Sequence, residues 1–178
     1  NVFVYQGEEL GLEQADVPFK NLQDPEAIKN WPETLGRDGA RTPMPWTSDP
    51  PYAGFSDAEP WLPVDPRHLR DSVASQEQDP TSMLNFTRAL IRLRKESAAL
   101  KIGRINFVDA PEGLLVFERI AGDDRFICVF NLGHEAIKFT PAGHLKLVFA
   151  TALPKSTDGP ATGPVPGKLP VCSGYIAT

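Results

Sequence analysis

Proline constrains the first part of this chain more than any other residue. The sequence has 178 residues and 18 prolines, about twice the usual share, and most of them precede residue 67. Because proline lacks a backbone N–H and fixes φ, such a region cannot hold long helices or central strands. Aromatic side chains alternate with these prolines (Trp31, Trp46, Tyr52, Phe55 and Trp61). We therefore expect residues 13–61 to form a long, ordered loop packed against a scaffold.

Composition and charge exclude several classes of function. Apolar residues make up 41% of the chain, enough for a buried core, and the net charge is −5 with both signs interspersed. A nucleic-acid surface would need a basic face, so we expect no nucleic-acid partner. No apolar run approaches the length of a membrane span, and we see no signal peptide. We expect no membrane partner and a cytoplasmic protein.

Residues that bind metals or form disulfides are few. Two cysteines, Cys128 and Cys172, are too few for a disulfide framework; both fall on predicted strands, where we interpret them as small buried residues. The histidines His68, His134 and His144 are widely spaced, which disfavours a zinc site, and the last two fall at turns where we expect them to be solvated. We expect no metal or other cofactor.

Two carboxylates follow the first apolar run. We expect residues 1–6 to form a short buried strand that ends at Gly7, with Glu8 and Glu9 next in the chain. Barrels and doubly wound sheets place their chemistry just past such strand ends. The alternative, which we favour, is that one carboxylate lies at a helix N-terminus and the other pairs with a nearby arginine.

The stretch Gly36–Trp46 (GRDGARTPMPW) has the composition of a stiff loop that carries charge. It holds Arg37 and Arg41 near Asp38, and a guanidinium can pair with a carboxylate and still reach an oxygen-rich ligand. Trp46 offers a flat apolar surface for a sugar ring or another loop. The stretch is therefore either a binding loop or a surface loop with a structural ion pair.

The later part of the chain changes from helical to β-type patterns. We expect helical segments at Pro25–Lys29, with Asp24 as N-cap, at Leu69–Gln76, and from Asp79–Pro80 onward with an apolar face at Met83, Phe86, Leu90 and Leu93. From Lys101, turn signals separate short β-type runs (105–108, 114–120, 125–132, 136–139, 145–149 and 171–178). This spacing predicts an antiparallel β-sandwich, with a loop over residues 155–170. We place the domain boundary between Leu100 and Lys101.

Five blocks of the sequence resemble the C-terminal third of α-glucosidases of the α-amylase superfamily, glycoside hydrolase family 13, and are most similar to the oligo-1,6-glucosidase branch. The similarity covers residues 1–139, and its most specific block is Arg37–Trp46; from Pro141 onward only the architecture is similar. The blocks are Phe3–Gly11, Arg37–Trp46, Ala53–Phe55, Pro60–Leu62 and Leu90–Arg94.

The resemblance implies a fold of the α/β plus all-β class. Residues 1–6 would be the eighth strand of a (β/α)8 TIM barrel, residues 7–70 the loop after it, and Asp79–Leu100 the eighth helix. Residues 1–100 would then be the C-terminal part of the catalytic barrel, followed by an antiparallel β-sandwich over residues 101–178.

The resemblance also implies a retaining, exo-acting α-glucosidase whose catalytic aspartate and glutamate, and a third acid, belong to earlier barrel strands. No carboxylate of this chain matches their motifs, so we expect no catalytic residue here and no activity of this chain alone. In the family an arginine of this loop helps to hold the terminal sugar; Arg41 is the first candidate and Arg37 the second. Site-supporting residues would be Gln6, Glu8, Glu9, Asp38 and Trp46.

The expected partners are an α-glucoside substrate and the remainder of the barrel. Two other readings stay open. One is a carbohydrate-binding or interaction module, in which the sandwich is the functional unit. The other is a transglucosylase or a sucrose or trehalose isomerase of the same family.

Overall fold

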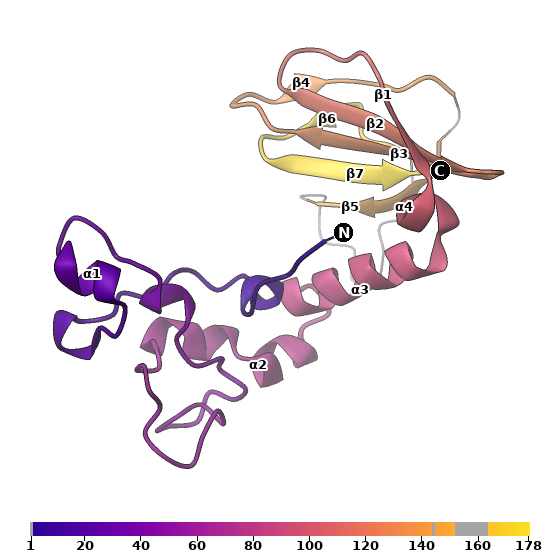
Figure 1. The fold of residues 1–178 in the computed structure, drawn as a ribbon. Helices are drawn as coiled ribbons and strands as arrows, with labels where there is room; N and C mark the ends of the chain where they lie inside the picture. Colours follow the sequence, from indigo (N-terminus) through magenta and orange to yellow (C-terminus); the bar gives the residue numbers. More distant parts are fainter. Residues whose placement is uncertain (1, 144, 152–163) are drawn as a thin grey trace. The chain divides into compact units, whose positions relative to one another are not determined.

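The computed structural model describes residues 2–143, 145–151 and 164–178 (Figure 1). It divides into two compact units, Asn1–Thr87 and Arg88–Thr178. The division falls inside helix α3 (Met83–Glu96), earlier than the boundary that we expected after Leu100, and the assignment of domains stays a prediction. In the described parts of the chain, none of the helices combines the length and apolarity that crossing a membrane requires.

The first unit consists mostly of loops and short helices, as its prolines predict. Its elements are η1 (Glu8–Leu10), η2 (Phe19–Asn21), α1 (Pro25–Lys29), η3 (Asp38–Ala40), η4 (Pro66–Asp71) and α2 (Val73–Gln78). The predicted cap of α1 is confirmed, since the Asp24 carboxylate accepts a hydrogen bond from the Glu26 N–H at 3.2 Å. The helix expected over Leu69–Gln76 is divided at Ser72, which caps α2.

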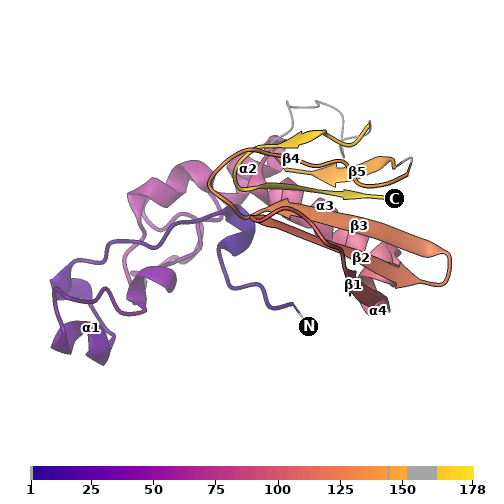
Figure 2. The ribbon, with the colours of Figure 1, turned by 90° about the horizontal axis from the view of Figure 1, so that it is seen from above.

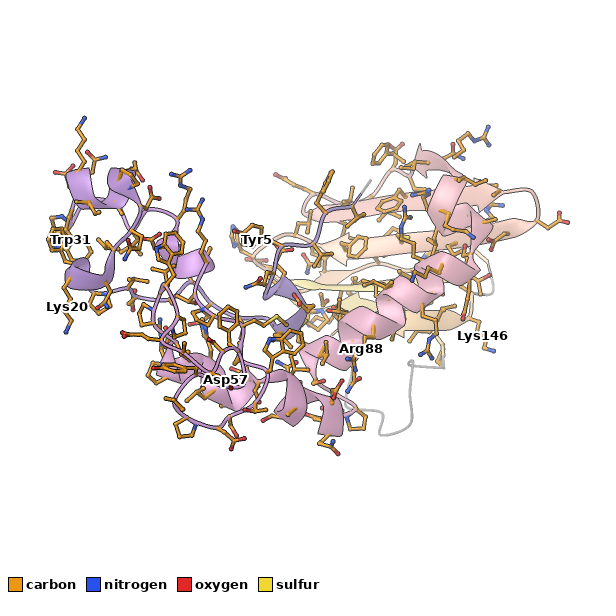
Figure 3. The ribbon with its side chains drawn as sticks, turned by 60° about the horizontal axis from the view of Figure 1, so that its bottom comes forward. Tyr5, Lys20, Trp31, Asp57, Arg88 and Lys146 are labelled. Atoms are coloured by element: carbon orange, nitrogen blue, oxygen red, sulfur yellow. The ribbon has the colours of Figure 1, made fainter. Side chains whose placement is uncertain are left out.

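A small core holds these loops together. It is formed by Val17, Leu22, Ala27 and Leu62. The rings of Phe19 and Trp31 lie with centroids 5.7 Å apart and link η2 to the end of α1. Figure 3 shows Trp31 and Lys20 at the same end of this unit. The long loop is thus ordered by apolar contacts, in keeping with the sequence.

The opening segment differs from the expected buried strand. Residues 2–5 belong to no helix or strand, and the Phe3 side chain is 90% exposed. The prediction of a buried strand is therefore wrong for this chain by itself, and Asn1 lies outside the described residues. A strand is stabilised by hydrogen bonds to a neighbouring strand, and the described residues supply none here.

Helix α3 begins later than predicted. Asp79 closes a turn through a hydrogen bond from the Thr81 N–H (2.8 Å), and the Ser82 hydroxyl accepts from the Asn85 N–H (3.2 Å) at the start of the helix. The predicted apolar face is only partly buried, since Met83 is 47% exposed and Phe86, Leu90 and Leu93 are half-buried. The buried residue of this helix is Leu84, which lies outside that predicted face. After α3, a separate short helix, α4 (Ala98–Ile102), follows.

The second unit is built on an antiparallel sheet. Strands β1 (Arg104–Phe107), β2 (Leu114–Ala121), β3 (Asp124–Asn131), β7 (Ser173–Ala177) and β5 (Leu147–Ala150) form it in the order β1-β2-β3-β7-β5, and β4 (Ile137–Lys138) pairs with β6 (Lys168–Leu169). Figure 2 shows β1, β2 and β3 side by side. The antiparallel pairing is confirmed, whereas the sandwich stays a prediction.

Local turn chemistry sets the register of this sheet. A two-residue turn at Gly122 and Asp123 joins β2 to β3, with Ala121 opposite Asp124. Gly122 has φ 60°, a value that favours glycine in such hairpins. The core beneath contains Val116, Val129, Leu147, Leu169, Tyr175 and Ala177. Strand β6 lies in the expected loop 155–170, whose residues 155–163 lie outside the described ranges.

The two cysteines differ in their surroundings. Cys128 is buried on β3, as predicted. Cys172 is exposed at φ 52°, in the turn that precedes β7, so the prediction of a second buried strand cysteine is wrong, because the strand begins only at Ser173. His134 is exposed at a turn, as expected, and His144 lies outside the described residues.

Candidate functional site

The predicted binding loop, Gly36–Trp46, is fixed to the preceding loop by two buried carboxylates. The Asp38 side chain is fully buried, and its Oδ2 accepts hydrogen bonds from the backbone N–H groups of Gln23 (2.6 Å) and Asp24 (2.8 Å). Its Oδ1 is buried with no partner among the described residues. Asp38 therefore organises the backbone and does not form the ion pair that we considered for this loop.

The ion pair of the loop joins Arg37 to Asp24. Asp24 Oδ2 accepts from both the backbone N–H and the Nε of Arg37, each at 2.9 Å, and Oδ1 accepts from Nη2 at 2.9 Å. The hydrogen bonds from Arg37 hold the pKa of Asp24 far below its ordinary value of 3.8, and those to Asp24 raise the pKa of Arg37 above its ordinary value. Both groups stay charged at neutral pH.

The two arginines of the loop are held very differently. The Arg37 side chain is 64% exposed although Asp24 is fully buried, and its Nη1 has no partner in the described ranges. Arg41 is exposed, and its guanidinium makes no hydrogen bond or ion pair with any described residue. Arg37 is thus an oriented cation that reaches solvent, whereas Arg41 is an unconstrained one.

The glutamates after the opening segment hold their own turn. Glu8 Oε2 accepts from the Tyr5 N–H at 3.0 Å, and Glu9 Oε2 accepts from the Gly7 N–H at 2.8 Å. Both lie in the first turn of η1, as the favoured alternative expected of one of them. Neither pairs with an arginine within the described part of the chain, so that half of the alternative is wrong.

A cavity of about 190 Å³ brings the opening segment and the binding loop together. Its lining includes Gln6 and Glu8, which follow the opening segment, and Gly39 and Ala40 of the binding loop. The other predicted site residues, Glu9, Asp38, Trp46 and the two arginines, do not line it. Gln6 and Glu8 therefore share a cavity with residues of the loop, and their role in supporting a site stays a prediction.

Two hydrogen bonds join the binding loop to Gln14 and Ala15. The Ala15 N–H donates to the Gly39 carbonyl at 3.0 Å, and the Gln14 side-chain amide donates to the Gly36 carbonyl at 3.3 Å. His68, which also lines the cavity, is buried, with Nε2 2.9 Å from the Glu13 carbonyl. Sequence reasoning missed His68, because no local pattern links it to a residue 55 positions earlier.

Trp46 is held at the end of the loop by backbone hydrogen bonds. Its N–H donates to the Ala53 carbonyl at 2.9 Å, and its carbonyl accepts from the Ala74 N–H at 3.0 Å. Trp46 is 49% exposed.

No group of three or more His, Cys, Asp or Glu side chains in the described ranges is arranged to hold a metal ion.

Comparisons with known proteins identify the family of this chain. The family model "Alpha amylase, catalytic domain" matches residues 1–103. A probable alpha-glucosidase from Rhizobium meliloti (strain 1021) is 47% identical over 135 residues, which are 76% of this chain and 24% of that protein. An oligo-1,6-glucosidase from Parageobacillus thermoglucosidasius is 27% identical over 162 residues, which are 80% of this chain and 29% of that protein.

Solved structures give the same result. An alpha-glucosyl transfer enzyme, XgtA, matches with a TM-score of 0.79 at 38% identity, over 98% of this chain and 32% of that one. The trehalulose synthase MutB from Pseudomonas mesoacidophila MX-45 matches with a TM-score of 0.72 at 27% identity, over 97% of this chain and 34% of that one. The chain spans about a quarter to a third of the length of these relatives. The resemblance seen in the sequence is confirmed: the chain belongs to the α-amylase family, glycoside hydrolase family 13, among its α-glucosidase-like members.

Proposed function

We propose that this chain is part of a retaining, exo-acting α-glucosidase that hydrolyses terminal α-linked glucose from maltose or short oligosaccharides. The names of its relatives support this substrate class. Retaining hydrolysis uses two carboxyl groups about 5 Å apart, beside the bond that breaks. Asp24 and Asp38 are buried and hydrogen-bonded within the loops around them, so neither is placed to act as a catalytic acid. In this proposal the segment supplies substrate binding, and the catalytic acids belong to the remainder of the barrel.

The observation that carries this proposal is the Arg37–Asp24 pair. A guanidinium has five N–H donors, and Asp24 occupies the Nε donor and one on Nη2, which leaves Nη1 to meet hydroxyls or a further carboxylate. A side chain that is oriented before its ligand arrives loses less conformational entropy on binding. This reverses the order that the sequence suggested: Arg37 becomes the first candidate for the sugar contact and Arg41 the second.

Alanine substitutions in the full-length protein that contains this segment test the proposal. Losing a charged hydrogen bond to the sugar lowers kcat/KM about 10- to 100-fold, so we expect this loss for Arg37→Ala on p-nitrophenyl α-glucoside and on maltose. Arg70→Ala is the control, because Arg70 is 80% exposed and pairs only with the adjacent Asp71 among the described residues. Values for Arg37→Ala and Arg41→Ala equal to that of the control would show that the loop binds no substrate.

The 178-residue chain by itself provides a second test. Without the catalytic acids it should release no glucose from either substrate. Hydrolysis by the purified chain, at a rate that scales with its concentration, would overturn the assignment of the chemistry to other parts of the barrel.

Glucosyl transfer is the second candidate function. It is favoured by the match to an alpha-glucosyl transfer enzyme at 38% identity. Hydrolysis and transfer share one covalent intermediate and differ only in the acceptor, water or a sugar. Analysing the products formed from maltose separates the two: free glucose alone supports the hydrolase, and new, longer or rearranged glycosides support the transferase.

A further inference from the structure

We propose that Asp24 is a positioning residue, which fixes the direction of the Arg37 guanidinium before substrate arrives. This inference rests on the proposed function, in which Arg37 contacts the sugar. Asp24 itself touches no substrate, because its side chain is fully buried while that of Arg37 is 64% exposed. One partner of the pair is therefore fixed within the unit, and the other extends from it.

The position of Asp24 is determined from several sides. Its Oδ1 accepts from the Glu26 N–H at the start of α1, and its own N–H donates to Asp38 Oδ2. Gly36 lies directly against this point: a Cβ there would stand 2.5 Å from the Cβ of Ala27 and 3.1 Å from Asp24 Oδ2. The carboxylate therefore has little freedom to rotate away from Arg37.

Arg37 and Asp38 hold Asp24 reciprocally. The side chain of Arg37 binds the side chain of Asp24, and the side chain of Asp38 binds its backbone. Arg37 and Asp38 are adjacent in sequence, and together they bind the side chain and the backbone of Asp24. The backbone and the guanidinium of Arg37 are therefore fixed together. Arg41 has no comparable support among the described residues, which is why the positioning role concerns Arg37 alone.

The same unit contains a matched control for this arrangement. Asp65 also precedes a proline and caps a helix, and it accepts from Arg67 Nε (3.1 Å) and Nη2 (2.6 Å). Arg67 also reaches Asp16 Oδ2 (3.4 Å) and the Gln14 carbonyl (3.4 Å). Neither Asp65 nor Arg67 contacts the side chain of Arg37 or Arg41 in the described parts of the chain. Asp65→Asn therefore measures how far the thermal midpoint and kcat/KM change when a capping carboxylate loses its charge and its arginine partner binds no sugar.

The decisive variant is Asp24→Asn in the full-length protein. Asparagine keeps the shape and the capping acceptor, but its amide NH2 replaces an oxygen that binds the guanidinium. Misplacing a binding group by about 1 Å costs up to about 100-fold, and we expect kcat/KM on p-nitrophenyl α-glucoside to fall about 10- to 100-fold. The thermal midpoint should fall no further than in Asp65→Asn, whose kcat/KM should stay at the wild-type value.

Two further variants separate positioning from simple stability. In an Arg37→Ala background, Asp24→Asn should lower kcat/KM no further, because Asp24 acts through Arg37. Arg37→Lys keeps the charge but lacks the planar fork, so it should lose as much as Arg37→Ala; this variant leaves Asp24 in place and decides the matter if Asp24→Asn does not fold.

The outcomes distinguish this inference from the proposed function. If Arg37→Ala leaves kcat/KM unchanged, the sugar contact itself is absent and the proposed function fails. If Arg37→Ala lowers kcat/KM while Asp24→Asn behaves like Asp65→Asn, or if Arg37→Lys keeps the wild-type value, the sugar contact stands and the positioning role is wrong.

Discussion

At Gly39 the binding loop lies in close contact with Gln14 and Ala15. Gly39→Ala therefore tests how much this contact contributes to stability and to substrate binding. A Cβ at this position would collide with the Ala15 carbonyl oxygen and would lie 2.7 Å from Gln14 Cγ and 3.2 Å from the Ala15 nitrogen. Real Cβ atoms essentially never approach other atoms closer than 3.0 Å. Because the carbonyl belongs to the backbone, no side-chain rotation relieves the collision.

The cost follows from this geometry. The two backbone segments must separate by about 1 Å, and overpacking of this kind costs about 1–3 kcal/mol. The separation also breaks the 3.0 Å hydrogen bond from the Ala15 N–H to the Gly39 carbonyl, which is worth about 1 kcal/mol. We expect the free energy of unfolding of the first unit to fall by about 2–4 kcal/mol.

The same displacement moves Asp38 and Arg37, which lie one and two residues before Gly39. If the loop binds sugar, kcat/KM should fall at least about 10-fold at a temperature where the variant remains folded. The measurements are the thermal midpoint and kcat/KM of the full-length protein. Gly167→Ala is the control, since a Cβ there would meet only Thr140 Oγ1, at 4.0 Å. Equal midpoints and equal kcat/KM for the two variants would refute the close contact between Gly39 and Ala15 and its effect on the binding loop.

Three further predictions concern stability and reactivity. Val129→Ala empties a fully buried position in the core of the second unit and should destabilise it by about 2 kcal/mol in denaturant unfolding. Burial raises the pKa of the Cys128 thiol to about 11, so at about pH 8 Cys172→Ser should remove a thiol that reacts rapidly with Ellman's reagent, and Cys128→Ser should remove none. Hydrogen bonds from Arg67 lower the pKa of Asp65; the stability that Asp65 contributes is therefore present above its ordinary pKa of 3.8 and is lost as the pH falls through the lowered value. The thermal midpoint of Asp65→Asn should accordingly depend less on pH than that of the wild type between about pH 6 and about pH 2.

The second unit was the more predictable of the two, because its signals are local. The β-type runs 114–120 and 125–132 and the turn signal between them predict a hairpin without reference to distant residues, and the structure has β2 and β3 there. Cys172 shows where this reasoning ends: its β-type neighbours suggested a strand, but the chain is still turning at that residue.

The start of a helix was predictable where the sequence offered a single N-capping residue and not where it offered two close together. Asp24 and Pro25 start α1 as expected. The same Asp–Pro signal at Asp79 does not start α3, because Ser82 lies three residues later and supplies its hydroxyl to the Asn85 N–H. Two caps within four residues compete, and the sequence does not rank them.

The candidate site was predictable in its residue types but not in its pairing. Arg37 was recognised as an ion-pairing residue, yet its partner is not Asp38 beside it but Asp24, 13 positions earlier. No period connects two points of an irregular loop, so only the folded chain reveals this contact. The glutamates after Gly7 show the opposite case, since both bind backbone N–H groups within three residues.

The structure also explains how a loop with little regular secondary structure can hold a binding group in place. Sites on loops are generally less precise than sites on helices or strands. Here two fully buried carboxylates take the place of a regular element, because Asp24 and Asp38 accept backbone and side-chain N–H groups from both segments that they join. All of these bonds lie within residues 23–38, whereas residues 2–5 show no regular structure in the absence of strand partners. The orientation of Arg37 is therefore a property of the loop itself, which is why a single buried carboxylate, Asp24, is the place to test it.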